Sequence, residues 1–326
     1  MNRNTVRWII AVLMLLALAL GLSCPSIVEA EEETGRMTLP MDYTAGGNKT
    51  KEENWTYDGK TPVAYSDSTI EVSSEKSSVS VKIKGKSVKH EVWVIRIRIQ
   101  DPSQLRTAVS KDTYKGRGQA KGEDIAKSKN AVVAMNGDFF KYENDVGYVV
   151  RQGEFIRDAT DNKRGRIFDM LIIDSEGDFH TVPSATTEKI EAYTAENLTP
   201  LNRTILHTFN LGPVLVLNGE AQDIAASEAA RQGSYQWKYP QQRIALVQTG
   251  PLEYAIVEVY GQTDSSAGMT LEEFAALIAE KCPDAILAYN LDGGGSTNLI
   301  MNNKRICKTP GLREITDIIY FASAEE

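Results

Sequence analysis

The chain of 326 residues contains only three histidines and three cysteines, and their spacing does not suit a metal site. His90, His180 and His207 stand in unrelated contexts and no two cysteines form a C-x-x-C pair, so the spacing of a zinc site is absent. Two nucleotide-binding motifs are missing as well. Ser80 stands where a P-loop ending in "GKS" requires a glycine, and "GRGQAKG" lacks the glycine spacing of a dinucleotide fingerprint. We therefore expect neither zinc nor nucleotide binding of these kinds.

Positive charge is in deficit, with 36 lysine and arginine residues against 44 aspartate and glutamate residues. The formal net charge of −8 gives nucleic acid no general binding surface, so we expect no nucleic-acid partner. With 42% hydrophobic and 25% charged residues, the composition excludes a disordered chain, collagen and a coiled coil. The length suits one large globular domain or two small ones.

The longest apolar run lies at the N-terminus and is shorter than the roughly 20 residues of a membrane-spanning helix. Arg3 and Arg7 precede this run, which covers residues 8–22, and small residues such as Ala30 follow it. This is the anatomy of a signal peptide over residues 1–30, cleaved before Glu31. We expect export from a bacterial cell to the surface or the medium, with membrane contact only through this segment. An uncleaved anchor is the alternative.

Two cysteines remain after such a cleavage, Cys282 and Cys307. An oxidising compartment would allow them to form a disulfide bond. Two buried free thiols are the alternative, and the sequence leaves the choice open.

After a polar leader over residues 31–60, to which we assign no fold, residue patterns of period two begin. Strands are expected over residues 61–89 and through "HEVWVIRIRIQDP", where alternation predicts one buried face. Further strands are predicted at "AVVAM", "RIFDMLIID", "GPVLVLNGE", "RIALVQT" and "LEYAIVEVYG". A short helix is expected in "GEDIAKSKN".

The clearest helix follows Thr270, which forms a capping box with Glu273. It joins the strand "LEYAIVEVYG" to the strand "AILAYNLD", so this part is a β-α-β unit with a glycine-rich loop at the carboxyl end of its second strand. The pattern as a whole predicts an α+β fold, with a mixed, largely antiparallel sheet, a few packed helices and a single catalytic-type domain.

Oxygen-bearing side chains follow two of the predicted strands directly. Asn136 and Asp138 lie in "MNGDFF", and Asn290 and Asp292 lie in "NLDGGGST". If the two strands are neighbours, the four side chains converge at one end of a sheet. Taken alone, "NGD" favours a type I′ hairpin turn, and "DGGGS" suits a tight bend, although one glycine normally suffices for that.

Converging carboxylates and amides suit two kinds of chemistry. They can hold Ca²⁺ or Mg²⁺, with Asp138 and Asp292 as the candidate ligands, or they can act as general acid, base and hydrogen-bond partners of a sugar. Arg243 and Arg313 are candidates for binding an anion, while the simpler interpretation of each is a solvated surface charge.

Six segments together resemble one family. They occur in its order and are "MNGDFF", "LGPVLVLNG", "QQRIALV", "GMTLEEFAALIAE", "NLDGGGSTNLI" and "TPGLREITDIIYF". The chain resembles the phosphodiester glycosidase family from about His90 to Ala322, and we place that domain at residues 90–326. Two positions depart from the common pattern, since Asp138 replaces a glycine of "NGGFF" and Gly261-Gln262 replaces Gly-Arg.

The resemblance implies hydrolysis of a sugar-1-phosphodiester, such as an N-acetylglucosamine derivative, into free sugar and a phosphomonoester. The substrate would be a carbohydrate phosphodiester or a cell-surface polysaccharide, in exopolysaccharide metabolism. A catalytically weak protein that binds or assembles polysaccharide in the same cleft is the alternative. The resemblance demands no cofactor, and Ca²⁺ or Mg²⁺ stays open.

Roles for the residues follow from that reaction. Asp138 and Asp292, with Asn136 and Asn290, are the expected catalytic groups. The expected substrate contacts are bidentate arginines, backbone N–H groups of the glycines, two hydroxyls and one aromatic ring. These residues are Arg243, Arg313, Gly293, Gly294, Gly295, Ser296, Thr297 and Phe140.

Overall fold

The computed structural model describes residues 36–83, 86–114, 118–138, 147–161, 167–231, 237–261 and 268–326. Residues Met37–Glu326 form one compact unit. Several predicted features lie outside the described residues. They are the signal peptide, leader residues 31–35, Phe140 and Gln262. Within the described parts, no helix has the length and apolar character needed to cross a membrane.

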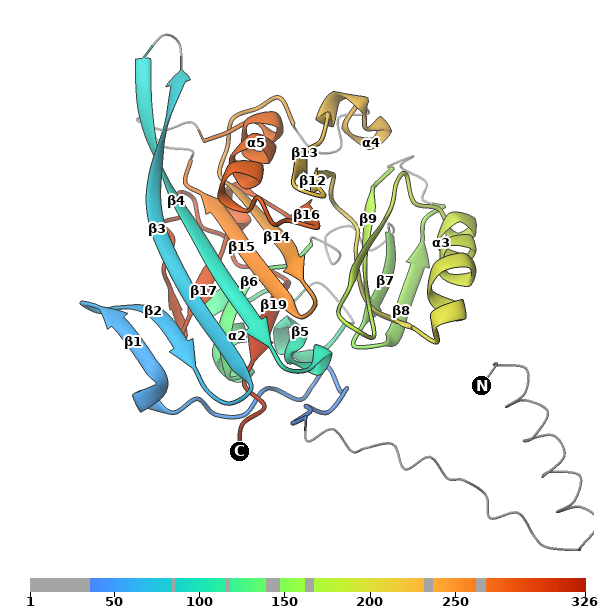
Figure 1. The fold of residues 1–326 in the computed structure, drawn as a ribbon, viewed down its shortest axis with the longest axis horizontal. Coiled ribbons are helices and arrows are strands. Elements are labelled where there is room, and N and C mark those ends of the chain that lie inside the picture. The colour runs from blue at the N-terminus through green and yellow to red at the C-terminus, as the bar shows by residue number, and fades with distance from the viewer. Residues whose placement is uncertain are drawn as a thin grey trace, which may run out of the picture. The chain divides into compact units, whose positions relative to one another are not determined.

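Antiparallel strands dominate this unit (Figure 1). The strands are β1 (Trp55–Asp58), β2 (Thr61–Ser66), β3 (Ile70–Ile83), β4 (Lys86–Ile99), β5 (Leu105–Val109), β6 (Ala131–Asn136), β7 (Gly147–Arg151), β8 (Glu154–Ala159), β9 (Met170–Asp174), β10 (Phe179–Val182), β11 (Ile205–Phe209), β12 (Val214–Leu217), β13 (Glu220–Ala221), β14 (Arg243–Gly250), β15 (Glu253–Val259), β16 (Leu287–Asn290), β17 (Leu299–Met301), β18 (Lys304–Arg305) and β19 (Asp317–Ala322). The α-helices are α2 (Gly122–Ser128), α3 (Thr187–Tyr193), α4 (Glu228–Arg231) and α5 (Leu271–Lys281). The predicted α+β class is confirmed.

The largest sheet has nine strands in the order β1-β2-β3-β4-β15-β14-β16-β12-β13. One face of it packs on a five-stranded sheet of order β18-β17-β6-β19-β5, and the shared core includes Ile95, Leu246, Met135 and Phe321. Its other face is covered by α5, which contributes Phe274 and other apolar side chains to a second core. The nine-stranded sheet is therefore a central layer between a helix and a second sheet.

This layering corrects one expectation for β4. Alternation predicted a single buried face, yet Trp93 and Ile95 belong to the core between the sheets while Val92 and Val94 belong to the core under α5. Side chains of β4 are exposed near both ends of the strand, at Lys86, Ser87 and Lys89 and again at Arg98. A strand buried on both faces has a continuous apolar sequence, as the middle of β4 does at residues 92–95.

The β-α-β unit is confirmed, with one strand inserted. β15 and β16 each pair antiparallel with β14, so they run in the same direction with β14 between them. Thr270 and Glu273 form the expected capping box at the start of α5. After β16 the chain leaves the nine-stranded sheet, passes through the glycine loop, which includes the short helix η7 (Gly294–Ser296), and enters β17 of the five-stranded sheet.

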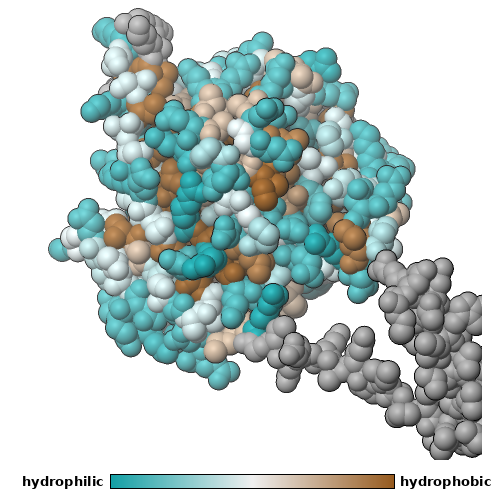
Figure 2. Space-filling model, viewed as in Figure 1, coloured by the Kyte–Doolittle hydropathy of each residue, from teal (hydrophilic) through white to brown (hydrophobic). Residues whose placement is uncertain are grey.

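Two smaller sheets lie beside these layers, one of order β10-β9-β11 and one formed by β7 and β8, with α3 packed outside (Figure 1). On the face that Figure 2 shows, hydrophobic residues form separate patches between hydrophilic ones. That distribution is ordinary for a folded protein surface.

The structure differs from the expectation of a foldless leader up to residue 60. Trp55 is buried in β1, and the segment that begins at Met37 is held by two buried cations. Arg106 donates to the carbonyls of Pro40 and Asp42 at 2.8 and 2.9 Å, and Lys129 donates to the carbonyl of Thr44. The segment is thus part of the compact unit, and backbone carbonyls, which no side-chain pattern reveals, attach it.

The expected boundary at residue 90 also falls inside a structural element. β4 begins at Lys86 and pairs with β3 along its whole length on one edge, and with β15 on the other edge.

The two cysteines Cys282 and Cys307 are buried free thiols. Cys282 belongs to the core under α5 and Cys307 to the core between the sheets, so the central sheet separates them.

Candidate active site

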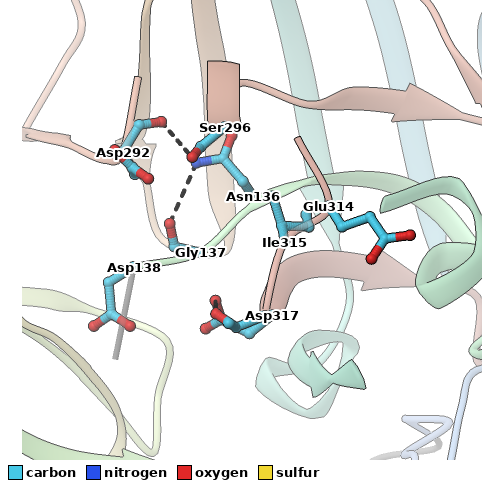
Figure 3. A pocket seen from close by; sticks show the side chains of 9 residues that line it. Asn136, Gly137, Asp138, Asp292, Ser296, Glu314, Ile315 and Asp317 are labelled. Carbon is cyan, nitrogen blue, oxygen red and sulfur yellow. Dashed lines mark hydrogen bonds between the residues drawn. The ribbon is translucent and has the colours of Figure 1, made fainter. Parts of the chain in front are cut away.

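A small polar pocket lies where the ends of the two large sheets meet (Figure 3). It is lined by Asn136, Gly137, Asp138, Asp292, Ser296, Glu314, Ile315, Thr316 and Asp317. The predicted convergence of the residues after β6 and β16 is found, but the expected route to it is wrong. The two strands lie in different sheets, and the glycine loop brings Asp292 across to the end of β6.

The side chain of Asn136 joins the two segments. Its amide nitrogen donates to the main-chain carbonyl of Asp292 at 2.7 Å, and its amide oxygen accepts from the N–H of Asn298 at 3.0 Å. Figure 3 shows the first of these bonds. Because both polar atoms are engaged by the protein, Asn136 positions the pocket and is not placed to contact the substrate with its amide.

Gly137 is required by a close approach of Asp317. In the antiparallel pair of β6 and β19, Ile318 lies opposite Asn136, so Asp317 lies level with Gly137, and the N–H of Gly137 donates to the Asp317 carbonyl at 3.2 Å. A Cβ at Gly137 would lie 2.4 Å from Asp317 Oδ2. The "NGD" sequence therefore makes room for a carboxylate. It does not connect β6 to β7 as a hairpin, because β7 pairs with β8.

A buried arginine lies between two of the carboxylates. Arg151 Nη2 is 3.0 Å from Asp138 Oδ1 and 3.6 Å from Asp317 Oδ2, and all three side chains are almost fully buried. The other oxygen of Asp138 accepts from the N–H of Asn210 at 2.9 Å. Phe209 stacks below the guanidinium, with its ring centroid 4.6 Å from the Arg151 Cζ atom. One cation thus serves two acids.

The environment raises the pKa of Arg151, Asp317 and Asp292, for different balances of causes. Burial opposes the charge of Arg151, but Asp138 and Asp317 outweigh that and raise its pKa. Burial, and then repulsion by Asp138, raise the pKa of Asp317 well above its ordinary value, despite the attraction of Arg151. Burial also raises the pKa of Asp292, against the opposing effects of Ser296 and Arg313. The pocket therefore favours the protonated form of Asp317.

The three glycines are explained by close contacts within the protein. A Cβ at Gly293 would lie 2.4 Å from the carbonyl oxygen of Gln242, and one at Gly295 would lie 2.6 Å from the carbonyl oxygen of Gly311. Gly294 has a φ of +58°, a left-handed conformation that suits glycine. The N–H of Gly294 donates to the Gln242 carbonyl at 2.9 Å, so this amide does not serve a phosphate as expected.

The two hydroxyl residues after the glycines have separate surroundings. Ser296 lines the pocket, and its Oγ accepts from Nη2 of Arg313 at 2.8 Å. Thr297 is fully buried, and its hydroxyl has no hydrogen-bond partner among the described residues. Arg313 itself is exposed beside the loop. Ser296 and Arg313 are therefore placed where an anionic substrate group can reach them, and Thr297 is not.

Arg243 and Asn290 lie behind the pocket and do not line it. Arg243 donates to the carbonyls of Met269 and Tyr239 at 3.1 and 2.8 Å. Burial lowers its pKa, and the attraction of Asp292 partly offsets this. Asn290 donates to the carbonyl of Gly212 at 2.7 Å. The direct bidentate contact with substrate that was expected of Arg243 is thus not supported, since it does not line the pocket and two of its N–H groups donate to backbone carbonyls.

The residues present do not fit a Ca²⁺ or Mg²⁺ site between Asp138 and Asp292. Both oxygens of Asp138 accept hydrogen bonds from protein donors, one of them a cationic arginine. Among the described residues, no group of three or more histidine, cysteine, aspartate or glutamate side chains is close enough to hold a metal ion.

Arg151 and Asp317 were missed from the sequence. Arg151 ends the apolar strand "GYVVR", the same signal that singled out Asn136 and Asp138. Asp317 is the first residue of β19. Because β19 pairs antiparallel with β6, the start of β19 lies beside the end of β6. Identifying Asp317 required the knowledge that β19 pairs with β6, which the sequence pattern does not contain.

Comparison with known proteins gives a family and a fold. The family profile described as phosphodiester glycosidase matches residues 129–322. Among solved structures, the catalytic domain of zebrafish N-acetylglucosamine-1-phosphodiester alpha-N-acetylglucosaminidase, auto-inhibited by its pro-peptide, is similar, with a TM-score of 0.60 and 17% identity over 83% of this chain and 87% of that chain. A hypothetical protein from Synechocystis aligns with a TM-score of 0.50 and 17% identity, over 80% of this chain and 64% of that one. No curated protein matches.

Proposed function

The chain belongs to the phosphodiester glycosidase family, and on that basis we propose that it hydrolyses a sugar-1-phosphodiester at the bond between the anomeric carbon and the phosphate oxygen. The observation that carries the proposal is the arrangement of Asp138, Asp292 and Asp317 around one pocket, with Arg151 between two of them. Burial raises the pKa of both Asp292 and Asp317, and neighbouring carboxyl groups in different environments can take different roles in one reaction.

Asp138 stabilises the reacting sugar in this scheme. Arg151 and the Asn210 N–H fix its carboxylate by two hydrogen bonds. Cleavage at the anomeric carbon passes through an oxocarbenium-like transition state, which a fixed carboxylate stabilises electrostatically. Asp138 is therefore assigned to the developing positive charge.

Asp292 takes the proton of the attacking water. Its raised pKa makes it a better base than an ordinary aspartate. Water adds its oxygen to the anomeric carbon, the proton passes to Asp292, and the electron pair of the broken C–O bond leaves with the phosphate. The products are the free sugar and a phosphomonoester.

Asp317 and Arg313 serve the polar groups of the substrate. Asp317, protonated, is assigned to donate a hydrogen bond to a substrate oxygen, because its carboxyl group lines the pocket and its raised pKa favours the protonated form. Arg313 is exposed and already bonded to Ser296, so it is available to the phosphate as charge builds on the leaving oxygens. A phosphate is a weak base, and this electrostatic help replaces a strong acid.

We further infer that the substrate is a cell-surface or exopolysaccharide phosphodiester outside the cytoplasm. The support is the signal-peptide pattern of residues 1–30 together with the acidic composition of the chain, which fits no nucleic acid partner. N-acetylglucosamine is the first sugar to examine, because the similar zebrafish enzyme is named for it.

The experiment is release of free sugar from an alkyl ester of N-acetylglucosamine 1-phosphate by the purified protein and by Asp292→Asn. We expect turnover by the parent and a loss on the order of 10³-fold in the variant, whose fold is unchanged. Binding of the ester without turnover by either protein would contradict the enzyme and favour a polysaccharide-binding protein.

A further inference from the structure

Glu258 is a fully buried carboxyl group that the proposed chemistry does not use. It lies in β15, in the interior of the nine-stranded sheet, with Ile244 of β14 and Trp93 of β4 as its cross-strand neighbours. Its Oε1 accepts from Nε2 of Gln242 at 2.7 Å. Its Oε2 has no hydrogen-bond partner among the described residues.

Gln242 connects Glu258 to both sides of the glycine loop. Its main-chain carbonyl accepts the N–H of Gly294 at 2.9 Å and would lie 2.4 Å from a Cβ at Gly293. Its side-chain amide donates to Glu258 and also to the carbonyl of Lys308 at 2.8 Å. Gln242 thus hydrogen-bonds both the glycine loop that follows Asp292 and the segment after β18.

The segment after β18 returns to the same loop. The hydroxyl of Thr309 donates to the carbonyl of Thr297 at 2.7 Å, and the N–H of Arg313 donates to the carbonyl of Gly295 at 2.9 Å. The glycine loop is therefore held from two sides, and Gln242 takes part in both supports.

We propose that Glu258 is a positioning residue that fixes the glycine loop, and with it Asp292, by holding the side chain of Gln242. This inference rests on the proposed function for its catalytic consequence, while the loop itself can be tested without turnover. Glu258 does not line the pocket, so it acts only through Gln242.

Burial favours the neutral form of Glu258, while the polar and charged groups around it act in both directions. Glu91 on β4 repels its charge, Lys76 on β3 attracts it, and Lys76 is already paired with Glu91 at 2.8 Å. Burial raises the pKa of the Cys307 thiol, and the charge of Glu258 adds to this effect. Burial is the largest effect and raises the pKa of Glu258 to about 8.

Ionisation would thus place a charge in the core directly against the support of the loop. The pKa of Glu258 is higher in the folded protein than in the unfolded chain, so its contribution to stability is complete below about pH 4.5 and is lost as pH rises through about 8. The hydrogen bond from Gln242 favours the ionised form, but burial outweighs it. We therefore expect the core around Glu258 and Gln242, and with it the loop, to loosen over the upper part of this range, because the buried charge is incompletely compensated there.

The test that needs no turnover is hydrogen exchange of the amides of residues 290–298 between pH 7 and 9.5, corrected for intrinsic exchange, in the full protein. Protection is expected to fall by about tenfold or more in the parent and to stay level in Glu258→Gln, which keeps the acceptor but cannot ionise. Glu253→Gln, at the exposed start of the same strand, is the matched control and should behave like the parent.

The catalytic readout is the pH profile of kcat on the sugar phosphodiester. Glu258→Gln should keep kcat and KM within about twofold at pH 7 and lose the fall in kcat near pH 8. Equal pH dependence of loop protection in the parent and in Glu258→Gln would overturn the proposal. If Glu258→Gln does not fold, constant protection in the parent up to pH 9.5 overturns it equally. Failure of turnover in every protein would refute the proposed function and leave the exchange result intact.

Discussion

The side-chain amide of Asn136 donates a 2.7 Å hydrogen bond to the main-chain carbonyl of Asp292, and this single contact joins the ends of two different sheets. The side-chain oxygen of Asn136 accepts the N–H of Asn298, the residue just before β17 of the five-stranded sheet. The buried amide of Asn136 thus links the residues after β6 directly to those after β16. Asp138 and Asp292 face the same pocket because of it.

Replacing Asn136 by alanine should disturb that junction. Two buried bonding groups lose their partner, so we expect the free energy of unfolding to fall by about 2–4 kcal/mol and kcat to fall more than tenfold. Thermal unfolding and the sugar-release assay measure the two effects. Asn197, whose exposed amide donates to the Tyr193 carbonyl, is the control, and Asn197→Ala should change neither by much. Equal behaviour of the two variants would refute the role of Asn136.

Arg151 should contribute strongly to stability because it is the cation beside the buried Asp138 and Asp317. Arg151→Met leaves Asp138 and Asp317 without their cation, and breaking a buried ion pair in this way costs about 3–5 kcal/mol. Arg96→Met removes a half-exposed ion pair with Asp284 and should cost about 1 kcal/mol or less. Denaturant unfolding of both variants is the measurement. Similar losses would show that Arg151 is not the compensating charge.

The glycine loop should tolerate no side chain at Gly293. The Cβ of Gly293→Ala would meet the Gln242 carbonyl at 2.4 Å, so the loop must shift and Asp292 must move with it. We expect kcat to fall by roughly 10²-fold, as misplacement by about 1 Å often produces. At Gly250 a Cβ would meet the end of the flexible Glu253 side chain at 3.0 Å, and Gly250→Ala should keep its activity. Full activity of Gly293→Ala would contradict the packing argument.

Asp138 and Asp317 should respond differently to amide substitution. Asp138→Asn loses the carboxylate that stabilises the transition state, and we expect a loss of at least about 10²-fold at every pH. Asp317→Asn keeps a hydrogen-bond donor and should lose less than about tenfold near pH 6. The comparison is the pH profile of kcat for the parent and both variants.

Stability should follow the pKa of Asp317 as well. That pKa is raised by folding, so the carboxyl's contribution is complete below its ordinary pKa of about 4 and is lost as pH rises through its folded value. The parent should therefore lose stability relative to Asp317→Asn as pH increases. A gap between the two unfolding midpoints that does not change with pH would contradict the raised pKa.

Sequence patterns predicted the local secondary structure and some of the residues of the site. Capping by Thr270 and the β15-α5-β16 unit follow from periodicity and cap residues, which are local properties of the chain. The placement of Asp138 and Asp292 followed from their positions at strand ends. What could not be predicted depends on pairing between distant segments: Asp317 is level with Gly137 only because β19 pairs with β6.

The glycines show the same limit. Three in a row indicate a close approach, yet the sequence does not say to what. The partners are the carbonyls of Gln242 and Gly311, which lie far away along the chain. In the same way, Arg243 lies at a strand start, where a solvated charge is usual, and only the packing of the chain around Met269 and Tyr239 buries it.

The central claim is cleavage at the anomeric carbon, and hydrolysis of the N-acetylglucosamine 1-phosphate ester in water enriched with ¹⁸O tests it most directly. The phosphomonoester product is examined by mass spectrometry. Attack of water on the sugar carbon predicts a phosphomonoester without the label, because its bridging oxygen leaves with the phosphate. A labelled phosphomonoester would place the attack at phosphorus and contradict the assignment of Asp138 and Asp292 to glycosidic chemistry.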